Sequence, residues 1–164
     1  MDLIDSHAHL EFAQFDEDRA EMLARAREAG VSLLLAIGSG SGPARLDAAI
    51  PFAEQHDWIY ATVGIHPHEA KLASGEHYTE LERLARHPRV IAWGEVGLDY
   101  FYDHSPREVQ QEVFRRQLGM AQAARKPLVI HCREAWDDCL RILEEDWRAT
   151  GLGGILHCFS GTLQ

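Results

Sequence analysis

Short apolar runs alternate with longer helical segments along almost the whole chain, and this alternation restricts the fold more than any other feature. The apolar runs have the length of strands, and the segments between them have the periodicity and end signals of helices. The expected strands cover residues 3–9, 31–37, 58–64, 90–95, 128–131 and 154–157, and the expected helices cover residues 17–28, 43–56, 77–87, 106–124 and 134–150. Strands that are apolar throughout and separated by helices are typical of parallel strands that are covered on both faces. The pattern predicts an α/β fold of six β units with five intervening helices.

The chain is expected to form one domain over residues 1–164. Its length suits a single ordinary domain, and it has no linker, no low-complexity segment and no internal repeat beyond the βα unit. The glycine-rich segment 38–43 lacks the lysine of a P-loop and the glycine spacing of a dinucleotide-binding turn. A phosphate-binding loop is therefore a weak interpretation of this segment.

The formal net charge of −10 limits the class of partner. A protein that wraps duplex nucleic acid normally presents a basic face, and the sequence shows no such cluster. A nuclease that holds only a strand end through bound metal ions can still be acidic overall. The charge weighs against binding of long duplexes and leaves phosphodiester chemistry open.

Three further features favour a cytoplasmic protein without a membrane partner. No apolar window is long enough to cross a bilayer, and residues 1–5 lack the positive charge of a secretory signal. Cys132, Cys139 and Cys158 are odd in number and have no CxxC spacing, so we expect reduced thiols.

Metal-capable side chains end or follow five of the six expected strands, and only the second strand, ending near Gly38, lacks one. In a strand–helix barrel the carboxyl ends of the strands meet at one rim, where active sites are built. The candidate residues at this rim are His7, His9, His66, His68, Glu95, His131 and His157. Their shared position predicts that they contribute to one site.

His7 and His9 are two residues apart on the first expected strand, so both imidazoles can point to the same side and reach one ion. The alternative is a pair of histidines that make structural hydrogen bonds at a loop. Asp5, close by in the sequence, is a candidate for orienting one of the imidazoles.

Glu95 ends an apolar strand between glycines, where a carboxylate is costly unless it is paired or bound to metal. One interpretation is an ion pair with Arg133 or a lysine. The other is a carboxylate that bridges two ions, because the surrounding candidate ligands outnumber those that one ion needs.

His131 and His157 each follow an apolar strand. Either one alone would be read as a structural histidine, but together with His7, His9 and Glu95 they favour a metal site. A set of histidines and a carboxylate without cysteine suits Zn²⁺, Mn²⁺ or Mg²⁺, and the nitrogen-rich ligands favour zinc or manganese. Cys132 and Cys158, adjacent to these histidines on their strands, are expected to face away and pack.

His66 and Arg133 are the candidates for contact with a substrate. His66 is expected to bind a substrate phosphate or to donate a proton, with a histidine pair shaped by Pro67 as the alternative. Arg133 is expected to clamp a phosphate with its planar fork, with an exposed salt bridge as the alternative.

Five motifs in order resemble the TatD family of metal-dependent deoxyribonucleases. They are IDSHAHL at residues 4–10, GIHPH at 64–68, GEVGLDY at 94–100, PLVIHCR at 127–133 and HCFSG at 157–161. The resemblance implies a TIM-type (β/α)8 barrel with two divalent metal ions. It assigns His7 and His9 to one ion and His131 and His157 to the other, with Glu95 as the bridge. It also implies metal-dependent DNA hydrolysis, including 3′-to-5′ exonuclease action.

The chain departs from the family pattern at two places. Glu11 stands where the family usually has Asp or Asn, and the sequence ends at Gln164, before the aspartate that the family supplies from its eighth strand. We therefore expect about six of the eight βα units, a domain incomplete at its C-terminal end, and weaker binding of at least one ion. We also expect a further segment or another protomer to cover the open edges of the sheet.

A metal-activated water needs no serine or cysteine nucleophile, so the ligands alone do not separate related reactions. The leading hypothesis is a divalent-metal-dependent DNase that acts on strand ends. The alternatives are a small-molecule amidohydrolase or esterase on the same metal site, and an inactive metal-binding fragment.

Overall fold

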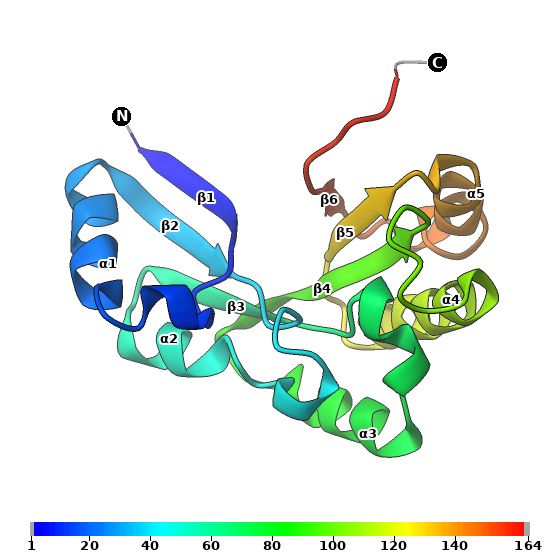
Figure 1. The fold of residues 1–164 in the computed structure, drawn as a ribbon, viewed down its shortest axis with the longest axis horizontal. Helices are drawn as coiled ribbons and strands as arrows, with labels where there is room; N and C mark the ends of the chain where they lie inside the picture. Colours follow the sequence, from blue (N-terminus) through cyan, green and yellow to red (C-terminus); the bar gives the residue numbers. More distant parts are fainter. Residues whose placement is uncertain (1, 163–164) are drawn as a thin grey trace.

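The computed structural model describes residues 2–162, which form one parallel sheet in the order β1-β2-β3-β4-β5-β6. The sheet curves like an open trough, with the helices on its outer side and with β1 and β6 at its two edges (Figure 1). This arrangement is an α/β half-barrel, as the alternation of apolar runs and helical segments predicts. No helix within these residues is long and apolar enough to span a bilayer.

The strands and helices alternate along the chain. The strands are β1 (Leu3–Ala8), β2 (Val31–Ala36), β3 (Ile59–Val63), β4 (Val90–Asp99), β5 (Leu128–Arg133) and β6 (Gly154–Leu156). The α-helices are α1 (Arg19–Glu28), α2 (Ile50–Gln55), α3 (Gly75–Leu84), α4 (Arg107–Ala123) and α5 (Trp136–Asp146). Four short 3₁₀ helices complete the described elements: η1 (Ala13–Phe15), η2 (Pro43–Arg45), η3 (Pro67–Leu72) and η4 (Arg148–Thr150).

The helix expected over residues 43–56 is wrong in its first half, because α2 begins only at Ile50. Pro51 occupies the first turn of α2, where backbone N–H groups have no partner within the helix, so the N–H that proline lacks is not needed. A helix running from residue 43 would place the same proline in its interior, where it removes a hydrogen bond and collides with the preceding turn.

The strand expected to end at Glu95 is also longer than predicted, because β4 continues to Asp99. Val96 and Leu98 are fully buried, and the added residues pair with β5, with Gly97 opposite His131 and Asp99 opposite Arg133. The register of this pairing shifts between Gly94 and Val96, beside Glu95. Glu95 therefore lies within a buried strand rather than at its end.

Both faces of the sheet are apolar, since alternate strand residues enter different clusters. On β2, Leu34 belongs to the large core and Leu35 to a smaller cluster with Ala92 and Val129. The large core includes Leu23, Leu81, Phe114, Leu118 and Ile142 from the helices together with Ile59 and Trp93 from the strands. This packing fixes the strands and hence the positions of the residues at their carboxyl ends.

Two buried glutamines on α4 connect the helix to the strands. Gln117, 1% exposed, accepts hydrogen bonds from Ile65 N (2.8 Å) and Trp93 Nε1 (3.2 Å) and donates to Ile65 O (3.0 Å). Gln110 accepts from Asp99 N (2.8 Å) and donates to Asp99 O (2.9 Å). The two side chains hold the chain that follows β3 and the end of β4 against α4.

Replacing Gln117 with leucine should destabilise the fold. The change preserves most of the side-chain volume but leaves a buried N–H, a carbonyl and an indole N–H without partners, which should lower the free energy of unfolding by about 2–4 kcal/mol. Equilibrium unfolding in urea measures the effect. Gln122→Leu, at an exposed position of the same helix, is the control and should change stability by no more than ~0.5 kcal/mol. Equal stability of the two variants would contradict the structural role of Gln117.

Candidate metal centre

The side chains predicted to share a rim come from five strands or from the residues directly after them. His7 lies on β1 and His9 just beyond it, His66 follows β3, Glu95 lies on β4, His131 lies on β5 and His157 follows β6. Contacts between these side chains are 3.0–4.0 Å long. The carboxyl ends of the parallel strands thus bring together all the residues selected as metal ligands.

Glu95 is the centre of this group and is 3% exposed. Its Oε2 atom lies 3.3 Å from His7 Nε2 and 3.9 Å from His9 Nε2. Its Oε1 atom lies 3.0 Å from His131 Nδ1 and 4.0 Å from His66 Nε2. The two carboxylate oxygens therefore face two separate sets of imidazoles.

The electrostatics of Glu95 favour its anionic form. Burial raises the pKa of this carboxyl group, but hydrogen bonds with His131 and His7, together with electrostatic attraction to His66 and His7, outweigh burial and hold the pKa well below its usual range. The alternative ion pair with Arg133 or a lysine does not form among the described residues. Within residues 2–162, the ion-pair partners of the Glu95 carboxylate are all imidazoles, and neutral imidazoles are metal ligands.

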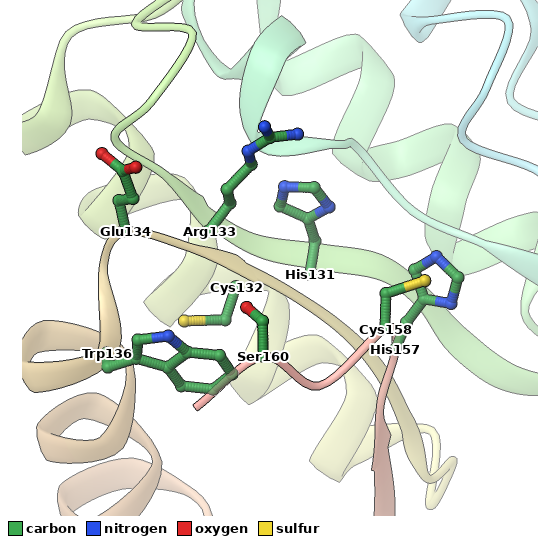
Figure 2. Close-up of a pocket in the computed structure, with 8 residues that line it drawn as sticks. All are labelled: His131, Cys132, Arg133, Glu134, Trp136, His157, Cys158 and Ser160. Carbon is green, nitrogen blue, oxygen red and sulfur yellow. The ribbon is translucent and has the colours of Figure 1, made fainter. Parts of the chain in front are cut away.

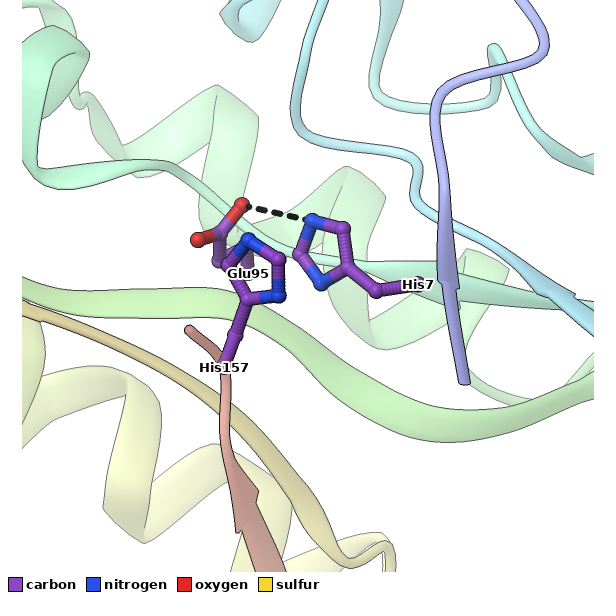
Figure 3. Close-up of side chains that lie close together, drawn as sticks. All are labelled: His7, Glu95 and His157. Atoms are coloured by element: carbon purple, nitrogen blue, oxygen red, sulfur yellow. Dashed lines mark ion pairs between the residues drawn. The ribbon is translucent and has the colours of Figure 1, made fainter. Parts of the chain in front are cut away.

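His157 lies against His7 rather than against His131. The two rings stack with centroids 3.4 Å apart and planes inclined by 12°. Ligand atoms of His7, Glu95 and His157 lie within 4.8 Å of one another (Figure 3). Burial and the neighbouring His7 lower the pKa of His157, which favours its neutral, ligand-competent form. This grouping differs from the assignment drawn from the family resemblance, which pairs His157 with His131.

Asp99 joins the site although the sequence reasoning did not select it. Its Oδ2 atom lies 2.8 Å from both His131 Nε2 and His68 Nε2, and the side chain is fully buried. Burial raises its pKa, but a backbone hydrogen bond from Tyr102 and contacts with His68 and His131 lower it to about 2. The other candidate ligands were selected because they end or follow an apolar strand. Asp99 meets the same criterion, since it follows the apolar residues that continue β4 and is the last residue of that strand.

His131 bridges the two carboxylates, with Nδ1 facing Glu95 and Nε2 facing Asp99. Burial lowers its pKa, but the two carboxylates raise it by a larger amount. A metal-binding histidine commonly donates its second ring N–H to a carboxylate, which fixes the tautomer. Asp99 is placed to orient His131 in this way.

His9 has a similar partner in Glu11, whose Oε1 atom lies 3.1 Å from His9 Nδ1. Asp5, the residue expected to orient an imidazole, instead accepts a hydrogen bond from the backbone N–H of His7 at 3.0 Å. Glu11, which appeared only as a departure from the family pattern, is therefore the carboxylate that orients a candidate ligand.

His66 has a defined tautomer. Its Nδ1 atom accepts a hydrogen bond from the backbone N–H of His68 at 3.2 Å, so the proton of the neutral ring lies on Nε2. Burial lowers its pKa to about 3, against the opposing effect of Glu95. Metal binding through Nε2 would require the proton to move to Nδ1, which would break the hydrogen bond with His68. His66 is better suited to donate a hydrogen bond than to hold an ion.

The donor set fits a divalent ion. His7 Nε2 lies 3.2 Å from His9 Nε2 and 3.3 Å from Glu95 Oε2. Donors in a tetrahedral shell with bonds of roughly 2.1 Å are roughly 3.4 Å apart, which matches these separations. Nitrogen and carboxylate donors of this kind suit zinc or manganese.

A cavity of about 630 Å³ opens at the candidate metal centre, between the ends of β5 and β6, and is lined by the candidate ligands His131 and His157 (Figure 2). Arg133 and His131 point to one side of β5, and Cys132 points to the other and is buried, as expected. The prediction that Cys158 packs is wrong, because this residue is exposed. β6 ends at Leu156 and Cys158 adopts a positive φ of 44°, so strand alternation does not apply to it.

Comparisons with known proteins agree with this architecture. A family model described as "TatD related DNase" matches residues 4–164. The chain is 38% identical over 162 residues to the "uncharacterized metal-dependent hydrolase YabD" of Bacillus subtilis, and 39% identical over 161 residues to the "3′-5′ ssDNA/RNA exonuclease TatD" of Erwinia tasmaniensis. These matches cover 99% and 98% of this chain but 62% and 61% of the relatives.

Solved structures give the same result. The crystal structure of YjjV, a TatD homologue from Escherichia coli, superposes with a TM-score of 0.88 at 31% identity and covers 99% of this chain and 62% of that chain. A TatD family hydrolase from Entamoeba histolytica superposes with a TM-score of 0.87 at 26% identity, covering 99% and 60% respectively. The chain spans about three fifths of the length of the relatives that it matches. It belongs to the family of TatD-related DNases.

Proposed function

We propose that this chain carries the metal centre of a divalent-metal-dependent hydrolase that cleaves phosphodiester bonds at the ends of single-stranded nucleic acid. The observation that carries the proposal is the buried Glu95, whose two oxygens face different sets of imidazoles. Relatives named as 3′-5′ exonucleases of single-stranded DNA and RNA support this substrate class and direction.

The proposed ligands are His7, His9, Glu95, His131 and His157, holding two divalent ions of zinc, manganese or magnesium. His7 and His9 face Oε2 of Glu95, and His131 faces Oε1, which supports a bridging role for the carboxylate. Bound divalent ions would lower the pKa of a water molecule and neutralise charge on the phosphoryl oxygens. Asp99 and Glu11 would keep the ligand imidazoles in the required tautomer.

His66 and Arg133 are proposed to bind the substrate phosphate. The Nε2–H of His66 points toward the cluster and can donate to a phosphate oxygen, whereas its low pKa disfavours a role as proton donor at neutral pH. Arg133 is exposed, and its guanidinium makes no ion pair within the described part of the chain, so its N–H groups are available for a phosphate.

A second candidate is hydrolysis of a small amide or ester, because the same ligands can activate water for those substrates. The net charge of −10 favours this alternative, since it opposes binding of a polyanion. Turnover of single-stranded oligonucleotides and of uncharged model esters by the same metal-loaded protein discriminates between the two functions.

Replacing Glu95 with glutamine in the full-length protein should reduce metal-dependent phosphodiester hydrolysis at least roughly 100-fold. The change keeps the shape of the side chain but removes the negative charge and one acceptor oxygen. Turnover of a single-stranded oligonucleotide after metal saturation measures the effect, and circular dichroism verifies the fold. Glu28→Gln, at an exposed position near the end of α1, is the control and should retain full turnover. Normal turnover in the Glu95 variant would exclude the bridging role.

Metal content should report two sites. After removal of metal by a chelator and reloading with Zn²⁺, the full-length protein should bind two ions per chain, and His9→Ala and His131→Ala should each lose one, because they face different oxygens of Glu95. Elemental analysis gives the stoichiometry. His87→Ala is the control and should bind two ions, since His87 contacts Glu54 outside the centre. A wild-type stoichiometry of one would disprove the two-ion arrangement.

A further inference from the structure

We propose that Phe101, Tyr102 and Arg133 form a stacking platform for a nucleobase of the single-stranded substrate, beside the candidate metal centre. The platform comprises these three side chains, of which the two aromatic residues follow β4 and the arginine ends β5. The inference rests on the proposed function and adds to it the contact that recognises the base rather than the phosphate.

The two aromatic side chains are exposed at the rim. Phe101 and Tyr102 are each 49% exposed, and their rings meet nearly at right angles with centroids 4.8 Å apart. Neighbouring exposed aromatic groups beside a polar site are typical of ligand contact, because covering their apolar surface with a ligand lowers the free energy. Bases stack on aromatic side chains in proteins that bind single strands without sequence preference.

Arg133 extends this surface and adds positive charge. Its guanidinium carbon lies 4.1 Å from the centroid of the Phe101 ring and 4.8 Å from that of Tyr102. The cation–π contacts hold the guanidinium in place while leaving its N–H edges without a carboxylate partner among the described residues. A planar guanidinium can stack on a base and also attract the adjacent phosphate.

Asp99 fixes the platform relative to the candidate metal centre. Its Oδ1 atom accepts hydrogen bonds from the backbone N–H groups of Phe101 (3.0 Å) and Tyr102 (2.9 Å), while its Oδ2 atom lies 2.8 Å from His131 Nε2. Gln110 in turn binds the backbone of Asp99 through both its N–H and its carbonyl. A single buried carboxylate thus connects the loop that carries the aromatic rings to a proposed metal ligand.

The surroundings favour a base from a single strand over a duplex. The faces of bases in a duplex are covered by their neighbours, whereas those at a single-stranded end are free to stack. The net charge of −10 also opposes binding along the backbone of a long duplex. Affinity for a strand end must then come from local contacts, and the platform supplies both stacking and one positive charge.

Equilibrium binding tests the platform without turnover. Fluorescence anisotropy measures the binding of a labelled single-stranded oligonucleotide with hydrolysis-resistant phosphorothioate linkages, and of the same oligonucleotide with abasic sites at its 3′ end, to the metal-loaded full-length protein. The base-carrying oligonucleotide should bind roughly tenfold more tightly, which is the scale of one stacking contact. Phe101→Leu and Tyr102→Leu should reduce this roughly tenfold preference to about twofold or less, because loss of a ring weakens binding of the base-carrying oligonucleotide more than binding of the abasic one.

Two matched variants control for general effects. Tyr102→Phe keeps the ring and should preserve the preference for the base, whereas a structural role of the hydroxyl group would remove it. Leu140→Ala trims a side chain on α5 that is similarly exposed and should have no effect on binding. Urea unfolding of each variant verifies that the replaced, half-exposed side chains do not support the fold.

The outcomes separate the platform from the proposed function. Equal affinity of the parent protein for the two oligonucleotides, absence of binding to either, or an undiminished base preference in the leucine variants would overturn the platform. Hydrolysis of bis(4-nitrophenyl) phosphate by the same metal-loaded protein tests the metal chemistry independently. Retained base preference without any hydrolysis would overturn the proposed function and leave the platform standing.

Discussion

The buried carboxylate of Glu95 is the constraint on which the rest of the site depends. A charge held within an apolar strand costs free energy unless nearby groups replace the water that it loses. His7 from β1 and His131 from β5 supply that replacement, although β1 and β5 are separated by three strands in the sheet. The contacts are possible only because the sheet curves until the ends of its strands converge. The curvature of the half-barrel and the charge at its rim therefore depend on each other.

The close approach of β4 and β5 adds a second requirement. Gly97 pairs with His131 at a φ of 143°, and a Cβ atom at this position would collide with the carbonyl oxygen of His131. Only glycine adopts this conformation readily and leaves room for the neighbouring backbone. Gln110 then holds the backbone of Asp99 through two hydrogen bonds. The carboxylate of Asp99 in turn contacts Nε2 of His131. His131 is thus positioned from three directions by β4: through Glu95, Gly97 and Asp99.

The sequence was sufficient to predict the parallel α/β fold and the meeting of the candidate residues at one rim, because both follow from the order of apolar runs. The sequence was less informative where a polar residue, normally expected at the surface, is buried in the folded protein. Glu95 resembled the end of a strand because a carboxylate in an apolar run is normally exposed, yet β4 continues past it to Asp99. Gln110 and Gln117 had the polarity of surface positions on α4, and only the folded chain provides the backbone groups that they bind. Pro51, by contrast, carried a usable signal for the start of α2.

The distribution of charge explains how an acidic chain could serve a polyanionic substrate under the proposed function. On the outer helices, Arg115 contacts Glu145 and Asp146, and Arg141 contacts Asp138, so these arginines are neutralised locally. Arg133 instead lies over aromatic rings at the rim, where no carboxylate within residues 2–162 pairs with its guanidinium. Attraction between exposed charges decays over about 8 Å at physiological ionic strength. Bound divalent ions and Arg133 would therefore act only on phosphates that enter the rim, while the net charge of −10 opposes the approach of a longer polyanion, which favours a strand end over the body of a duplex.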